Sequence, residues 1–150
     1  MKRLPLILCA TVLGAAAFAP NAFALDFKSV GAAPAIMYDA PSEKGRRVYV
    51  APRGMPVEVV LTYGEWSKVR DAAGTLSWLQ SKTLTPKRML VVSAANARIF
   101  NAADEGSAVV FTADKNVLLE MIESPHNGWV KVRHRDGQTG FARAADVWGD

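Results

Sequence analysis

The chain carries one sequence pattern twice, which restricts it to folds built from two copies of a small unit. A shift of 62 positions aligns residues 35–40 with residues 97–102. The second copy then gains one residue within residues 124–128, after which a shift of 63 aligns residues 66–70 with residues 129–133. A single one-residue insertion, placed at a turn, is typical of a duplicated structural unit.

Each copy is composed of short strands. Residues 57–62 place Val57, Val59 and Leu61 on one side of an extended chain, and residues 48–50 are β-branched or aromatic. Turns that contain glycine separate such segments, and no segment beyond the N-terminal one shows a sustained helical period. Local antiparallel strands in a unit this small favour closure, since closure removes exposed sheet edges. The sequence therefore predicts an all-β fold: two tandem small β-barrels of about five strands each, packed together.

The join between the two copies is short. Only Thr85-Pro86-Lys87 has the character of a linker, and strand-like residues resume directly after it. We therefore place the first domain at residues 25–86 and the second at residues 87–150. The two domains should pack together, because a unit of this size buries too little apolar surface to be stable alone.

The first 24 residues have the order of a secretory signal peptide. A basic segment at residues 1–3 precedes an apolar stretch at residues 4–19, and Ala22 and Ala24 provide the small residues that a signal peptidase accepts. We expect cleavage after Ala24 and export to the periplasm, with secretion as the alternative, and no stable membrane insertion afterwards. The apolar stretch is short for a bilayer span, which makes an uncleaved anchor the weaker interpretation.

The only cysteine, Cys9, lies inside that apolar stretch. Lipoprotein processing requires a small residue directly before the cysteine, and Leu8 is large, so we do not expect a lipid anchor. The exported chain would contain no thiol, and its stability would depend on apolar burial alone.

The charge balance argues against nucleic acid as a partner. The chain has 18 basic and 14 acidic residues, and removal of Lys2 and Arg3 leaves 16 against 14. So small a surplus lacks the electrostatic footprint of a surface that binds nucleic acid. We interpret the short basic clusters as solvated faces, with attraction to anionic wall or lipid groups as the alternative. These clusters are Arg46-Arg47, Lys87-Arg88 and Arg133-His134-Arg135.

Few residues are available for catalysis. His126 and His134 are the only histidines, and both lie in or beside predicted turns. No His/Cys cluster has the spacing of a metal site. Glu58 and Glu120 occupy equivalent positions of the two copies, as expected for solvated strand positions rather than for an acid and base pair. The sequence predicts a protein that is not an enzyme, with no catalytic residue, no metal and no cofactor.

The alternation of side chains along a strand predicts the surface that binds a ligand. If Val69 points into its barrel, Trp66, Lys68 and Arg70 share the opposite face, and the second copy repeats this arrangement. An indole offers contact area, while Lys or Arg binds a carboxylate. The candidate ligand-binding residues are Tyr38, Trp66, Lys68, Arg70, Trp78, Phe100, Trp129, Lys131, Arg133 and Phe141.

Other roles for these aromatic residues stay open at this point. The Trp side chains, and Phe141 with them, could instead cap the barrels or seal the contact between the two copies. Tyr38 and Phe100 are expected in the first loop of each copy, where they would form walls of the binding groove.

The C-terminal half of each copy contains a characteristic order of residues. The second copy reads Gly-Trp-Val-Lys-Val at residues 128–132, Asp-Gly at residues 136–137, Gly-Phe-Ala at residues 140–142 and Val-Trp-Gly at residues 147–149. The first copy keeps part of this order, with Trp-Ser-Lys-Val-Arg at residues 66–70, Gly74, Trp-Leu at residues 78–79 and Leu84. The order resembles the bacterial SH3-like domain family, which typically has Gly-Trp-x-Lys-Val, a turn with Asp-Gly, Gly-Trp-Val and a final Leu. The ending looks like that of an exported tandem-repeat subgroup.

The resemblance implies tandem SH3-like barrels with a binding role. Domains of that family commonly bind cell-wall peptides or glycan, or act as targeting modules beside wall hydrolases, and no hydrolase is attached in this sequence. We therefore expect a non-catalytic exported binding module that recognises the peptide or glycan of peptidoglycan. The alternative is an adaptor that docks a specific periplasmic or envelope protein, because a fold does not determine a ligand.

Overall fold

The structure, a computed structural model, describes residues 24–150. Residues 1–23, which carry nearly all of the predicted signal peptide, lie outside the described part. The described chain is all-β, as predicted, and it forms two sheets of seven antiparallel strands each. No helix within residues 24–150 has the length and apolar character needed to cross a membrane.

The two sheets have the same composition and strand order. The first sheet contains β1 (Phe27–Val30), β2 (Ala35–Tyr38), β3 (Arg47–Ala51), β4 (Pro56–Tyr63), β5 (Trp66–Arg70), β6 (Leu76–Gln80) and β7 (Leu84–Thr85). The second contains β8 (Met89–Val92), β9 (Asn96–Phe100), β10 (Val109–Asp114), β11 (Leu118–His126), β12 (Trp129–Arg133), β13 (Thr139–Arg143) and β14 (Val147–Trp148). A single 3-10 turn precedes the last strand of each, η1 (Ser81–Thr83) and η2 (Ala144–Asp146). The spatial orders are β3-β2-β6-β5-β4-β1-β7 and β10-β9-β13-β12-β11-β8-β14, so the sequence repeat is a structural repeat.

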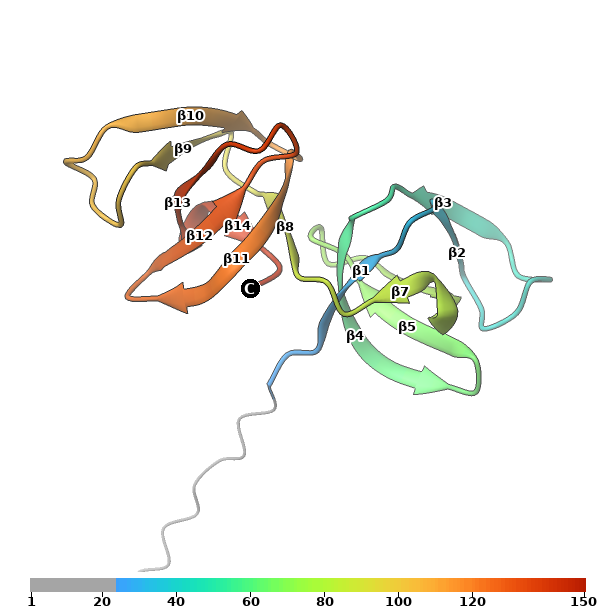
Figure 1. Ribbon diagram of the computed structural model, residues 1–150. Helices are drawn as coiled ribbons and strands as arrows, with labels where there is room; N and C mark the ends of the chain where they lie inside the picture. The colour runs from blue at the N-terminus through green and yellow to red at the C-terminus, as the bar shows by residue number, and fades with distance from the viewer. Residues whose placement is uncertain (1–23) are drawn as a thin grey trace, which may run out of the picture.

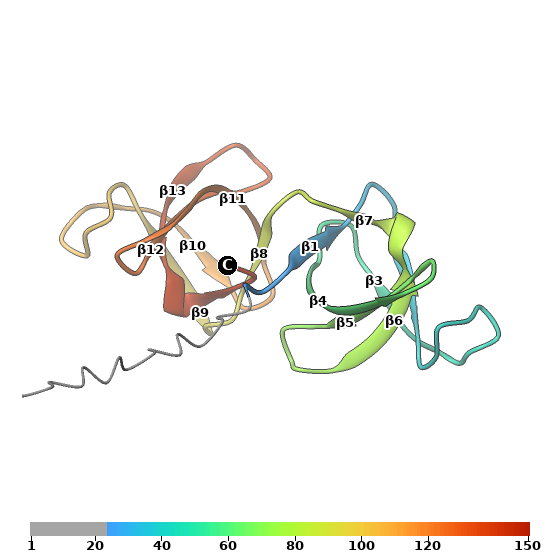
Figure 2. The ribbon, with the colours of Figure 1, turned by 90° about the horizontal axis from the view of Figure 1, so that it is seen from below.

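The two sheets form separate lobes that lie side by side (Figure 1). The chain passes from one lobe to the other between β7 and β8, and the second view shows the same connection (Figure 2). The C-terminus lies close to β8, because β14 pairs with that strand. The two ends of the second copy therefore meet next to the first lobe.

Each sheet has seven strands, where the sequence predicted about five. The additional strands belong to the ends of each copy. β7 and β14 have only two residues each, too few to show any alternation. β1 and β7 are joined by pairing across the whole domain, with Ser29 opposite Thr85 and Val30 opposite Leu84. Long-range pairing, which a local pattern does not reveal, therefore defines these strands.

Equivalent positions of the repeat make up the two cores. Val57 and Val69 in the first domain, and Leu119 and Val132 in the second, are all 0% exposed. Alternate residues of these strands face inward, so the residues between them face outward. This burial determines which face of β5 and β12 is free to meet a ligand.

A β-bulge in β4 changes which residues face outward. Val59 lies opposite Val69, but the next paired residue is Leu61, opposite Lys68, so Val60 is an extra residue. Directly opposed residues of antiparallel strands project to the same face, so Leu61 joins Lys68 on the outside. The predicted alternation, which placed Leu61 on the same side as Val59, is wrong beyond the bulge, and Leu61 is 45% exposed.

One contact between the lobes is formed by the ends of the two copies. Phe27 of β1 meets Trp148 of β14 edge-on, with ring centroids 5.0 Å apart. The Arg88 guanidinium lies 5.6 Å from the Phe27 centroid, and its Nη2 donates a hydrogen bond of 2.8 Å to the Gly149 carbonyl. This contact combines aromatic and cationic groups and involves none of the candidate ligand-binding residues.

Candidate functional site

Burial along β5 confirms the predicted division of its two faces. Ser67 and Val69 are buried, while Trp66, Lys68 and Arg70 lie on the opposite, partly exposed face. Burial alternates in the same way along β12 of the second domain. Both copies therefore present an aromatic residue and two cationic residues on the outer side of one strand.

Aromatic rings and one ammonium group form a row on the first domain. Trp66 packs edge-on against Tyr38 of β2, with centroids 5.5 Å apart. Trp78 of β6 lies opposite Lys68, whose Nζ is 5.8 Å from the centroid of the indole. An ammonium group within about 6 Å of an aromatic centroid is attracted by the electrons of the ring. The row thus combines apolar contact area with a positive charge.

The bulge in β4 adds two exposed apolar side chains to this row. It places Leu61 beside Lys68 and Tyr63 beside Trp66. Leu61 is 45% exposed and Tyr63 is 68% exposed. The sequence contained no signal for either residue, because regular alternation would have placed both on the core side.

One further apolar residue, Leu76, begins β6 and is 46% exposed. It precedes Trp78 by two positions, so both side chains share a face. That spacing is a signal which could have identified Leu76 from the sequence. We call this surface of the first domain the aromatic face, and it consists of Leu61, Tyr63, Trp66, Lys68, Leu76 and Trp78.

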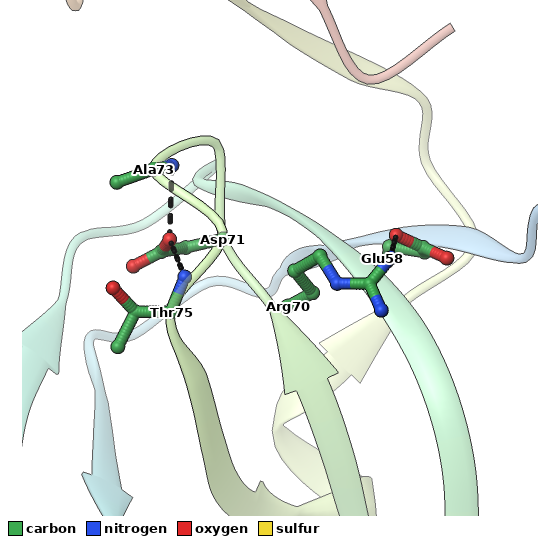
Figure 3. Close-up of polar contacts among 5 residues, drawn as sticks. All are labelled: Glu58, Arg70, Asp71, Ala73 and Thr75. Carbon is green, nitrogen blue, oxygen red and sulfur yellow. Dashed lines mark hydrogen bonds and ion pairs between the residues drawn. The ribbon is translucent and has the colours of Figure 1, made fainter.

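Arg70, at the end of β5, is engaged within its own sheet. Its Nη1 donates a hydrogen bond of 2.9 Å to Oε2 of Glu58 on β4 (Figure 3). In the turn that follows, Oδ1 of Asp71 accepts hydrogen bonds of 2.9 Å from the backbone N–H groups of Ala73 and Thr75. Arg70 therefore has a carboxylate partner already, which leaves less of its charge for a ligand.

An open cleft of about 700 Å³ borders Trp66 at one end of the aromatic face. Its walls come from the loop between β2 and β3, the turn before β5 and the η1 turn. Lys44 and Lys82 supply positive charge, and the Gln80 side-chain amide donates a hydrogen bond to the Glu43 carboxylate. The aromatic face thus continues into a polar hollow that carries both signs of charge.

The second domain repeats this geometry with a different outer surface. Trp129 packs edge-on against Phe100 with centroids 5.5 Å apart, and Lys131 Nζ lies 5.9 Å from the centroid of Phe141. Lys131 Nζ also lies 3.0 Å from Oε1 of Glu123. The ammonium group of the second domain therefore has a counter-ion of its own.

The repeated bulge explains this difference between the two domains. β11 has the same irregularity as β4, and it sets Glu123 opposite Lys131 as Leu61 is set opposite Lys68. Within residues 24–150, no carboxylate forms an ion pair with Lys68. The first domain presents an apolar surface with an unpaired ammonium group. In the second domain, the carboxylate of Glu123 neutralises the ammonium group of Lys131.

Tyr38 and Phe100 do not lie in loops, contrary to the prediction. Each is the last residue of its strand, β2 or β9, because the ladder continues through it to β6 or β13. Tyr38 is 6% exposed and Phe100 is 1% exposed. Both rings support the neighbouring indole from within the fold, so neither forms a wall of a groove.

The ten candidate residues form two groups of five rather than one site. One group lies on β2, β5 and β6, and the other lies on β9, β12 and β13. Arg133, at the end of β12, in addition lines a cleft between the two lobes. Among residues 24–150, no group of three or more His, Cys, Asp and Glu side chains is arranged to hold a metal ion.

The turn after β12 contains a carboxylate with a low pKa. Asp136 accepts hydrogen bonds from the backbone N–H of Gln138 at 3.0 Å and from its side-chain amide at 2.8 Å. Nδ1 of His134 lies 3.1 Å from Oδ1 of the same carboxylate. The backbone hydrogen bond foremost, then the side-chain amide and the histidine, lower the pKa of Asp136 from 3.8 to about 2. The carboxylate stays charged and keeps this turn in shape.

Comparison with known families gives two matches to one domain type. The family model of the bacterial SH3 domain matches residues 31–86 and residues 93–149. These two segments correspond to the two sheets. No curated protein matches the sequence.

Solved structures that resemble the chain include NlpC2 and NlpC1 from Trichomonas vaginalis and an NlpC/P60 family protein from Bacillus cereus ATCC 10987. Sequence identities are 11%, 12% and 17%, and TM-scores are 0.39, 0.39 and 0.37, in that order. The similarity covers 85%, 88% and 81% of this chain, but 49%, 48% and 55% of those chains. The chain thus spans about half the length of these structures.

Proposed function

Because the chain belongs to the bacterial SH3 domain family, we propose that it is a non-catalytic binding protein of the bacterial envelope that recognises peptidoglycan. The aromatic face of the first domain is the binding surface. The order of residues 1–24 supports export, and we place the protein in the periplasm.

One observation carries this proposal: Lys68 lies over an indole within an exposed apolar surface, and no carboxylate of residues 24–150 pairs with it. An unpaired ammonium group binds the carboxylate of a wall peptide in a charge-assisted hydrogen bond. The neighbouring aromatic rings offer flat apolar area, against which a sugar ring or a short aliphatic side chain can pack. Peptidoglycan provides both kinds of group in one polymer.

The two domains contribute unequally under this proposal. Lys131 would have to give up its partner Glu123 before it bound a ligand carboxylate, whereas Lys68 has no such partner to lose. The first domain is therefore the principal binding domain. The second domain packs against it and presents a weaker version of the same surface.

Co-sedimentation with purified peptidoglycan sacculi tests the proposal. Lys68→Gln and Lys131→Gln are matched variants, since each neutralises one ammonium group at equivalent strand positions. We expect Lys68→Gln to lower the sedimented fraction at least fivefold and Lys131→Gln to lower it less than twofold. Surface substitutions of this kind change stability by about 0.5 kcal/mol or less, so loss of folding would not explain the difference.

The outcomes separate the proposal from its alternative. Equal sedimentation of the wild type and both variants contradicts a binding role for the aromatic face. A parallel affinity pull-down from an envelope extract tests the adaptor role. If the wild type stays in the supernatant with sacculi, yet retains one envelope protein that Lys68→Gln loses, the partner is that protein and not the wall.

A further inference from the structure

A second cleft lies between the two lobes. It encloses about 840 Å³, residues of both domains line it, and no residue of the aromatic face is among them. Its floor is apolar where the lobes touch. A Cβ atom on Gly54 would lie 3.5 Å from Met89 Cε and 3.6 Å from Leu118 Cδ1, which is van der Waals distance across the junction. The cleft therefore exists only when both domains are folded and in contact.

Cationic side chains from distant segments converge on this cleft. Arg53 comes from the connection between β3 and β4, Lys87 from the join between the domains, and Arg133 and Arg135 from β12 and its following turn. Glu120 of β11 is the one carboxylate among the lining residues that the structure describes. Four cations thus face one anion, although residues 25–150 contain 16 basic and 14 acidic residues overall. Folding, rather than composition, concentrates the positive charge here.

The single carboxylate leaves two of the cations without a partner. Oε2 of Glu120 lies 3.3 Å from Lys87 Nζ and 3.9 Å from Arg133 Nη1. Arg53 and Arg135 are both exposed, and neither forms an ion pair with a carboxylate of residues 24–150. The cleft therefore presents two unpaired guanidinium groups, those of Arg53 and Arg135. Beside them, Lys87 and Arg133 share the single carboxylate of Glu120.

We propose that this cleft binds a ligand that carries several phosphate groups. A guanidinium group donates paired hydrogen bonds to phosphate oxygens, and a multiply charged anion matches the excess of cations. Arg53 and Arg135 are the principal contacts. Glu120 is an internal anion that competes with the ligand for Lys87 and Arg133. The phosphates belong to a soluble ester or to a lipid headgroup, two sources with the same chemistry.

Isothermal titration with sodium tripolyphosphate tests the cleft on the whole exported chain. Arg53→Glu and Arg135→Glu should each lower the affinity at least tenfold. Arg47→Glu is the matched control, because Arg47 is an exposed arginine of β3 that does not line the cleft, and it should lower the affinity less than twofold. Glu120→Gln should raise the affinity several-fold, since it removes the competing charge. Higher salt should weaken binding by the wild type.

Flotation with vesicles separates the two sources of phosphate. If the protein binds tripolyphosphate in the titration but does not float with vesicles, the ligand is a soluble ester. Flotation with vesicles that contain cardiolipin, whose headgroup carries two phosphate groups, identifies a headgroup if it is lost in Arg135→Glu and absent with phosphatidylcholine alone. An equal loss of affinity in Arg47→Glu and Arg53→Glu would indicate diffuse attraction and overturn the proposal, as would binding of neither probe. Circular dichroism checks each fold, and Arg53→Gln and Arg135→Gln replace any reversal that unfolds the protein.

Discussion

At the scale of single residues, Lys68 and Lys131 show how one neighbour changes the chemistry of a duplicated position. Their ammonium groups lie 5.8 and 5.9 Å from aromatic centroids, so the local geometry is the same. Leu61 lies opposite the first lysine, and Glu123 lies opposite the second. An exposed ion pair stabilises a fold by only about 0–1 kcal/mol, but it occupies the donors that a ligand needs. The difference between the two copies therefore affects binding more than folding.

Exchange of that neighbour should exchange the binding properties of the two domains. Leu61→Glu offers Lys68 a counter-ion, and Glu123→Leu removes the counter-ion of Lys131. We expect Leu61→Glu to lower the fraction that sediments with sacculi at least threefold, and Glu123→Leu to raise it. The control is Asp26→Leu, which removes a carboxylate that pairs with a lysine, Lys28, outside either row. A gain in Asp26→Leu as large as that in Glu123→Leu would refute the explanation.

From the low pKa of Asp136 we expect the stability of the second domain to depend on pH in the acid range. A carboxylate whose folded pKa of about 2 lies below its ordinary 3.8 stabilises the fold above pH 3.8, and this contribution is lost as the pH falls towards 2. Asp136→Asn keeps the shape and removes the charge. Its melting temperature should lie below that of the wild type at pH 6, and the two should converge near pH 2. A difference that persists unchanged at pH 2 would show that the charge is not responsible.

Gly140 is required because the backbone approaches it closely. A Cβ atom there would lie 2.7 Å from Ile99 Cγ2 and 2.7 Å from the Phe100 carbonyl oxygen. Gly140→Ala should therefore destabilise the protein by about 1–3 kcal/mol, as an overpacked core site does. Ser77→Ala, at the equivalent position of the first domain, is the control and should change stability little. Thermal unfolding of both variants measures the difference in stability. Equal melting temperatures of Gly140→Ala and Ser77→Ala would contradict the steric explanation.

At the scale of elements, the bulge in β4 determines what the first domain shows to solvent. Strand alternation alone would direct Leu61 into the core, but the extra residue Val60 reverses the direction of the side chains that follow. Leu61 and Tyr63 belong to the aromatic face because this one bulge turns their side chains outward. β11 has the same bulge with Glu123 in the outward position. The two domains therefore share the bulge but differ in the side chain that it turns outward.

A pair of glutamate substitutions tests the direction of these side chains. Val57 is 0% exposed, so Val57→Glu buries an unpaired charge and should unfold the first domain. Leu61 is 45% exposed, so Leu61→Glu should cost about 1 kcal/mol or less. Urea denaturation measures both. Equal destabilisation would mean that Leu61 points into the core and that the bulge is absent.

At the scale of the whole molecule, the two domains are coupled through the ends of their copies. Phe27, Trp148 and the Arg88 guanidinium form one contact, and the backbone of Gly149 joins it through the hydrogen bond from Arg88. A Cβ atom on Gly149 would lie 3.2 Å from Pro56 Cβ of the first domain, so the two domains approach each other closely here. This contact also holds together the two walls of the cationic cleft.

Trp148→Ala should uncouple the two domains. The half-buried indole stabilises the contact by about 2 kcal/mol, less than a fully buried one would. We expect one thermal transition in the wild type and two in the variant, with a larger radius of gyration in solution scattering. Tyr49→Ala, at a side chain that is 53% exposed on β3, is the control and should leave one transition. A single unchanged transition in Trp148→Ala would contradict the coupling.

The sequence by itself determined the features that depend on neighbouring residues. The duplication, the all-β class and the inward direction of Val69 all follow from a repeat and from an alternation of period two, which strand geometry imposes locally. The outward position of Trp66, Lys68 and Arg70 follows from the same alternation. These predictions hold because the extra residue of the bulge lies in β4 and not in β5, so the alternation along β5 itself is unbroken.

Only the tertiary structure decided which residues complete each surface. The two-residue strands and the burial of Tyr38 depend on pairing with strands far away in the sequence. The outward direction of Leu61 depends on a bulge that the alternating pattern of β4 does not show. The cationic cleft depends on the packing of two domains, which brings Arg53 and Arg135 together although 81 residues separate them. A local pattern specifies the direction of a side chain, but the partner that it meets depends on long-range register and packing.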